Sequence, residues 1–211
     1  MTHRTFVALI ADAVASRTLP AAARAQLQRD LRAALPRFNR RWHASLAARF
    51  AVTLGDELQC LLTTAAPVWE ITQVVRAELD SVDWVMACAR GPVNTTLHRG
   101  ITAPEVDGPC FHDARAALED AKQRGQLLAF RGFGATDVTL AGLASYYSAL
   151  HWSWTPRQRR AAKWLRASDP ARAAAELGVH RSAISHLARR MAWPLVSAGD
   201  SILRAQLDRT P

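Results

Sequence analysis

Residues 47–64 read AARFAVTLGDELQCLLTT, two apolar runs separated by a glycine and an acidic pair. The residues of each run are typical of strands, and Gly-Asp is common in hairpin turns. The stretch therefore predicts two antiparallel strands joined by a turn. Two interpretations of the acidic pair, Asp56 and Glu57, stay open: it is either the polar tip of the hairpin or part of a site for a cation.

Apolar periodicity predicts the elements that flank this hairpin. TFVALIAD (5–12) is expected to be a buried strand, and the helix over residues 21–42 carries Leu27, Leu31 and Leu35 on one face. Pro36 is expected to kink or divide that helix. The later expected elements are a helix at about 67–79, strands at DWVMACA (83–89) and QLLAFRG (126–132), a strand running into a turn at HRGITAPEV (98–106), and helices at FHDARAALEDAKQRG (111–125) and about 137–151.

This mixture of strands and helices predicts an α/β fold: an antiparallel-rich sheet with helices on one face, close to a ferredoxin-like plan. In that plan the end of the first strand lies beside the hairpin, so Asp12 approaches Asp56 and Glu57. Carboxylates gathered in this way suit Mg²⁺ or Mn²⁺, which bind through one or two carboxylates and substrate phosphates. Asp12, Asp56 and Glu57 are therefore the candidate metal ligands.

The positive charge is concentrated at the C-terminal end. The whole chain of 211 residues has a formal net charge of +9, and residues 155–211 contain 11 Lys and Arg against 4 Asp and Glu. Cationic side chains gain affinity for nucleic acid by displacing phosphate counterions. The asymmetry predicts a C-terminal domain that binds a polyanion.

Cysteine content and hydropathy exclude several other classes. Cys60, Cys88 and Cys110 are widely spaced without a C-x-x-C pair, so neither a disulfide framework nor a zinc site is indicated and reduced thiols in the cytoplasm are expected. The N-terminal apolar run is too short to cross a bilayer and is broken by Asp12, so no membrane association is expected. Neither G-x-S-x-G nor G-x-x-x-x-G-K is present, which argues against hydrolase and P-loop chemistry.

The segment TPRQRRAAKWLRASDPARAAAELGVHRSAISHLARRM (155–191) has two capped helix starts, Thr155-Pro156 and Asp169-Pro170. Ala174, Gly178 and Ile184 then follow at the spacing of a helix-turn-helix. The last helix would bury Ile184 and Leu187 and turn a polar face toward the major groove of double-stranded DNA. The candidate DNA-binding residues are His180, Arg181, Ser182, Ser185, His186, Arg189 and Arg190. A solvated basic helix is the alternative.

LIADAVAS (9–16) and LGDEL (54–58) resemble the palm domain of class III nucleotidyl cyclases and GGDEF proteins, which place one metal-binding Asp after the first strand and another acid in a hairpin. The resemblance departs where those cyclases carry an Asn and an Arg that steady the phosphates. The corresponding register here offers His112 and Ala116, or Arg115 after a shift by one residue. An active nucleotidyl cyclase is therefore not expected.

Over nearly the whole chain, the stretches IADAVASR, LGDELQ, RGI, DGPCFHDARAALEDAK and the C-terminal segment resemble the SatD family of bacterial proteins. The expected domains are a palm domain over 1–150 and a small all-α helix-turn-helix domain over 151–211. Two functions follow. The first is a DNA-binding regulator whose palm domain binds a divalent metal and senses a nucleotide or mediates homodimerisation. The alternative is a metal-dependent phosphoryl-transfer enzyme with a DNA-targeting tail.

Overall fold

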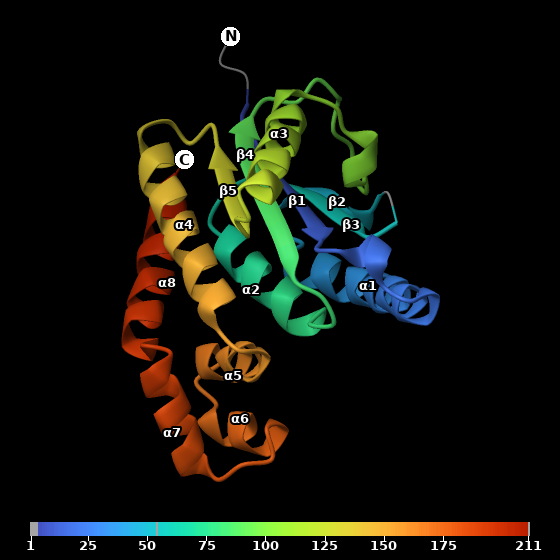
Figure 1. The fold of residues 1–211 in the computed structure, drawn as a ribbon. Coiled ribbons are helices and arrows are strands. Elements are labelled where there is room, and N and C mark those ends of the chain that lie inside the picture. Colours follow the sequence, from blue (N-terminus) through green and yellow to red (C-terminus); the bar gives the residue numbers. More distant parts are fainter. Residues whose placement is uncertain (1–3, 54, 211) are drawn as a thin grey trace.

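The computed structural model describes residues 4–53 and 55–210, which form one five-stranded sheet surrounded by helices (Figure 1). The sheet has the strand order β2-β3-β1-β4-β5. β1 is antiparallel to both β3 and β4, whereas β5 is parallel to β4. The strands are β1 (Phe6–Ala13), β2 (Leu46–Val52), β3 (Glu57–Leu62), β4 (Trp84–Gly91) and β5 (Leu128–Arg131).

Four helices accompany the strands in sequence, and four more follow toward the C-terminus. The first set is α1 (Ala21–Arg41), α2 (Val68–Glu78), α3 (Pro109–Gln123) and α4 (Asp137–Ser153), and the second is α5 (Pro156–Arg166), α6 (Pro170–Glu176), α7 (Arg181–Arg190) and α8 (Trp193–Asp208). The element order up to β4 is strand, helix, two strands, helix, strand. With the sheet order β2-β3-β1-β4, this is the ferredoxin-like arrangement that the sequence predicts, extended by β5.

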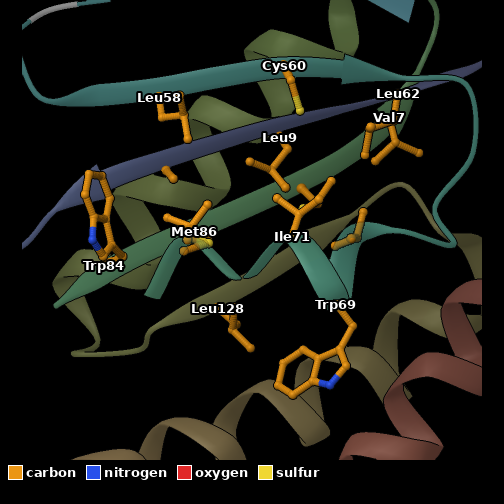
Figure 2. Close-up of a cluster of buried hydrophobic side chains, with 14 of the residues drawn as sticks. Val7, Leu9, Leu58, Cys60, Leu62, Trp69, Ile71, Trp84, Met86 and Leu128 are labelled. Carbon is orange, nitrogen blue, oxygen red and sulfur yellow. The ribbon is translucent and has the colours of Figure 1, made fainter. Parts of the chain in front are cut away.

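The main core lies between one face of the sheet and the helices α1, α2, α4 and α8. Alternate residues of β1, including Val7 and Leu9, point into it, and Ile71 of α2 meets them, whereas Trp69 of α2 points toward Tyr147 of α4 (Figure 2). The central strand is buried on both faces because Ala8 and Ile10 point the other way, toward α3. The expectation of helices on one face only is therefore wrong. A strand that is apolar at consecutive positions requires cover on both sides, and α3 supplies the second layer.

Two further local predictions need correction. Residues 98–106 are not a strand: Thr102 and Glu105 form a capping box that starts a short 3₁₀ helix (Ala103–Glu105), so the segment contributes only an isolated bridge, Arg49 to Thr102. Of the two outcomes expected at Pro36, division of the helix is wrong because α1 continues to Arg41, and a kink stays a prediction. Ala34 and Phe38 are buried on either side of Pro36, and this packing holds the helix against the sheet across the missing N–H donor.

The C-terminal helices leave the sheet and then return to it. α5, α6 and α7 pack around Ala162, Ala173, Ala174 and Ile184, and α8 runs back beside α4 (Figure 1). Leu203 and Leu207 of α8 belong to the main core. The expected boundary near residue 150 falls in the last turn of α4, and the C-terminal half of α8 shares the core of the sheet through these two leucines. We call α5–α7 (156–190) the helical segment.

Candidate functional site

The end of the sheet where β1 meets the β2–β3 hairpin carries the predicted acidic residues. Asp12 pairs directly with Glu57 across β1 and β3, so their side chains lie on the same face of the sheet. That face packs against α3, which brings Lys122 within 3.0 Å of an Asp12 carboxylate oxygen. The sequence prediction that the strand end and the hairpin converge is confirmed by this register.

Glu57 is held by several donors at once. Arg115 of α3 donates from both terminal nitrogens, one of them to Oε1 at 2.7 Å, and Thr53 Oγ1 donates to the same oxygen at 2.7 Å. Burial alone would raise the pKa of this carboxyl, but the hydrogen bonds from Arg115, Thr53 and Gln59 lower it below the ordinary value. Glu57 is therefore ionised and paired at neutral pH.

Asp12 is in a less favourable environment than Glu57. Burial is the largest cause of its raised pKa, the negative charges of Asp56 and Glu57 raise it further, and Lys122 opposes the rise. Among the described residues, Asp56 Oδ2 is a buried oxygen without a hydrogen-bond partner. The cluster thus has an unsatisfied acceptor and an excess of negative charge at Asp12 and Asp56.

These features decide how well a divalent cation fits. Across residues 4–53 and 55–210, no three His, Cys, Asp or Glu side chains are gathered closely enough to hold a metal. Asp56 offers a buried oxygen without a hydrogen-bond partner, whereas Asp12, whose pKa is raised mainly by burial, is paired with Lys122, so a cation held by these two carboxylates would have to displace that lysine. Glu57 has both oxygens bonded to Arg115, so its service as a ligand requires that pair to open.

A cavity of about 540 Å³ adjoins the acidic cluster on the α3 side. Ile10 and Gln59 line it from the sheet, and Phe111, His112 and Arg115 line it from α3. Ala116 is also part of the wall, so all three residues of the cyclase-like register face this space. Its volume is within the range of small-molecule sites.

The sequence analysis named Arg115 only for the cyclase-like register and gave Lys122 no role, so it did not predict that either cation of α3 pairs with the acidic residues. Arg115 and Lys122 are seven residues apart and so lie on one side of the helix, the side that also buries Ala114, Leu118 and Ala121. Two cationic side chains at the edge of a buried helix face need counter-ions nearby. Their spacing could therefore have predicted that α3 packs next to carboxylates. The sequence also gave His151 no role, whereas it lies 2.8 Å from Asp83, which in turn pairs with Arg159.

The second candidate region is the surface of α7. Ile184 is buried against Ala173 and Ala174 of α6, and Leu177 and Val179 of the connecting turn pack onto them. Gly178 in this turn has a φ of +60°, which a glycine adopts without strain. All seven predicted DNA-binding residues are exposed, namely His180, Arg181, Ser182, Ser185, His186, Arg189 and Arg190.

The sheet with its acidic end and the added C-terminal helices defines a mixed α/β protein with a ferredoxin-like core. A model of the SatD family matches residues 6–160. The chain belongs to the SatD family, which confirms the resemblance seen in the sequence for residues 6–160; for the segment after residue 160 it stays a prediction. No curated protein matches the chain.

Two solved structures of a bacterial light-regulated adenylyl cyclase are similar to this chain. The first has a TM-score of 0.40 and 12% identity, over 60% of this chain and 42% of the other. The second has a TM-score of 0.39 and 11% identity, over 62% of this chain and 77% of the other. This chain therefore spans less than half of the first structure, and likeness at this level carries no functional argument.

The described helices include none that is both long and apolar enough to cross a membrane.

Proposed function

We propose that this chain is a cytoplasmic DNA-binding regulator in which α6 and α7 form a helix-turn-helix and the sheet binds a divalent cation and a nucleotide. The observation that carries the proposal is the exposed basic face of α7. Its apolar side is buried, and its outward side chains are the types that contact phosphates and base edges.

The charges on this face support binding to a polyanion. Arg181, Arg189 and Arg190 are exposed, and within the described parts of the chain none of them is in an ion pair. His180 caps α7 by accepting from the backbone N–H of Ser182, so the first turn is well defined. A pre-formed helix whose cations have no internal partner can give its full charge to phosphate contacts.

Binding of the full-length chain to double-stranded DNA tests the proposal. The full chain is needed because Leu203 and Leu207 of α8 pack in the core of the sheet. Fluorescence anisotropy with a mixed-sequence duplex should show binding that weakens steeply between about 50 and 200 mM salt. Selection from a random duplex pool should then enrich one sequence. Absence of binding at about 50 mM salt would refute the proposal.

The metal and nucleotide part of the proposal is supported by the acidic cluster and the cavity beside it. Asp12 and Asp56 are the residues that would hold Mg²⁺ or Mn²⁺, and Arg115 lies between this cluster and the cavity. A bound cation would supply positive charge for phosphate groups. Nucleotide in the cavity would compete with Glu57 for Arg115.

A phosphoryl-transfer enzyme is the second candidate, and the presence of both a carboxylate pair and a cavity favours it. Two features of α3 argue against it. Ala116 stands at one of the two positions where the resemblance to cyclases would place the phosphate-steadying Asn and Arg, and Arg115 is already bonded to Glu57. Incubation with Mn²⁺ and each nucleoside triphosphate distinguishes the two. Cyclic nucleotide or pyrophosphate formation that is lost in Asp12→Asn would support the enzyme.

A further inference from the structure

A larger cavity, of about 590 Å³, lies between the helices that pack on the sheet and the helical segment, and none of the acidic cluster lines it. α2 and the turn after it form one wall, α5 forms another, and Tyr147 of α4 and Arg204 of α8 contribute to the rest. Its walls thus come from both parts of the molecule.

The wall formed by α2 contains hydrogen-bond donors without acceptors. Trp69, Gln73 and Arg76 lie at intervals of four and three residues on one side of α2; Gln73 and Arg76 line the cavity, and Trp69 lies next to them outside the lining. Trp69 Nε1, Gln73 Nε2, and both Nε and Nη1 of Arg76 are buried without a partner in the described structure. Each unsatisfied buried donor is costly, and a buried cation without a counter-ion costs more.

Arg76 is the clearest case. Its Nη2 donates to the Leu127 carbonyl at 2.9 Å, and its guanidinium lies over the Tyr147 ring, but it has no carboxylate partner among the described residues. Burial is the main cause of the lowered pKa of Arg76; Tyr147 and Asp83 oppose the fall, and the nearby charge of Arg166 adds to it. Within the described residues Arg76 therefore has no direct carboxylate contact, and only the longer-range charge of Asp83 offsets its own.

The other walls add to this positive excess. Arg160, Lys163 and Arg204 line the cavity, and none of them has an ion-pair partner in residues 4–53 and 55–210. The acids around the cavity are mostly engaged: Glu70 pairs with Arg41, and Asp83 pairs with Arg159. Four cations against one free carboxylate, Asp80, leave a net positive space. Tyr147, Trp154 and Trp164 also line it and offer aromatic surface.

We propose that this cavity binds a small molecule that carries several negative charges and a planar ring, the chemistry of a nucleotide. Arg160 and Lys163 of α5 donate to its phosphates, and Arg76 of α2 adds positive charge from the opposite wall. The volume is that of a small-molecule site and exceeds what a single inorganic ion requires. Because α2 and α5 both contribute, the ligand bridges the sheet and the helical segment. This site is separate from the acidic cluster and does not depend on the proposed function.

Thermal unfolding of the full chain in EDTA, with ATP, GTP or tripolyphosphate as probes, tests the proposal. At about ten times the Kd, a nucleotide should raise Tm by about 3–6 °C, and tripolyphosphate should raise it less because it has no ring. The shift should be lost in Arg160→Ala/Lys163→Ala. Asp12→Asn and the exposed Arg24→Ala are the controls and should keep it.

Arg76→Met provides a test that is independent of a folding defect. The Leu127 carbonyl still accepts from the Met86 N–H at 2.9 Å, so removal of the buried charge should leave Tm without ligand unchanged or raised. The nucleotide shift should nevertheless disappear. The proposal is overturned if no probe raises Tm or if the shift survives in the double variant. It is also overturned if Asp12→Asn loses the nucleotide-dependent rise in Tm. A further contrary result is a rise in Tm that depends on Arg160 and Lys163 but is produced only by duplex DNA.

Discussion

Arg115 of α3 and Glu57 of β3 form a two-bonded ion pair at the end of the sheet where Asp12 lies. Their side chains differ in exposure: 40% for Arg115 and 4% for Glu57. The pair therefore neutralises a carboxylate that the fold has buried. It also determines whether Glu57 is available to any cation or ligand at this site.

Loss of Arg115 should destabilise the chain by leaving Glu57 buried without its counter-ion. We expect Arg115→Ala to cost about 1–3 kcal/mol at neutral pH, less than for a fully buried pair because Arg115 is partly solvated. Urea unfolding measures this. Arg131→Ala removes an exposed pair with Asp113 and should cost under about 1 kcal/mol. Equal costs for the two variants would contradict the prediction.

The same pair predicts a pH dependence. Because the pKa of Glu57 in the folded chain is lowered from 4.5, the stabilisation is complete above about pH 4.5 and is lost as the pH falls through the folded pKa. The stability difference between wild type and Arg115→Ala should therefore shrink below about pH 4.5. Unfolding curves at several pH values test this, and a difference that grows in acid would contradict it.

Asp12 and Asp56 should act as one cation site. Asp12→Asn and Asp56→Asn should each abolish Mn²⁺-dependent stabilisation, and the double variant should lose little more. Without metal, Asp12→Asn should raise Tm, because burial and neighbouring carboxylates raise the pKa of Asp12 and make its ionised form unfavourable. A thermal-shift titration measures both effects. If wild type shows no shift with Mn²⁺, alone or with a nucleotide, the acidic pair is only the polar tip of a hairpin.

His151 should make stability depend on pH near neutrality. Burial is the main cause of its lowered pKa, the charges of Arg76 and Arg159 lower it further, and the hydrogen bond to Asp83 opposes this. The unfolded chain takes up a proton near pH 6.5, whereas the folded chain resists it, so stability falls as the pH drops below 6.5. His151→Gln should flatten that slope in denaturation curves, and a change at the exposed His43 should not.

Two glycines should respond in opposite directions to alanine. Gly178 has a φ of +60°, and Gly142 lies in α4 with an ordinary helical φ; neither would bring a Cβ within 4 Å of another group. Gly178→Ala should cost about 1–2 kcal/mol through backbone strain, and Gly142→Ala should gain about 0.5–1 kcal/mol through helix propensity. Chemical denaturation of both variants measures the contrast. A gain at Gly178 would contradict the described turn.

The α7 surface predicts two kinds of DNA-binding variant. Arg181→Ala or Ser185→Ala should weaken binding to the selected sequence by about 1–3 kcal/mol, as expected for a lost base contact. Arg190→Ala should weaken binding to all sequences and reduce the salt dependence. Anisotropy at several salt concentrations separates these effects, with Arg24→Ala on α1 as the control. Unchanged affinity in all three would show that another surface binds DNA.

The local elements were predictable because their signals are local. Alternating and helical apolar patterns gave β1 to β5 and α1 to α4, and Gly55 with Asp56 gave the turn between β2 and β3. The exception, residues 98–106, shows the limit of pattern: the capping box of Thr102 and Glu105 outweighed the apolar strand-like residues. The inward and outward faces of α7 also followed from spacing alone.

By itself, the sequence determined most of the helices and strands and which residues carry charge, since neighbours along the chain set propensity and periodicity; it did not predict α8. Only the tertiary structure decided that Arg115 neutralises Glu57, 58 residues away, and that α8 returns to the core of the sheet. It also decided that Arg76 and Lys163 line one cavity. These contacts depend on how whole helices pack against the sheet. No local pattern encodes that packing, because burial and charge pairing are set by residues that only the folded chain brings together.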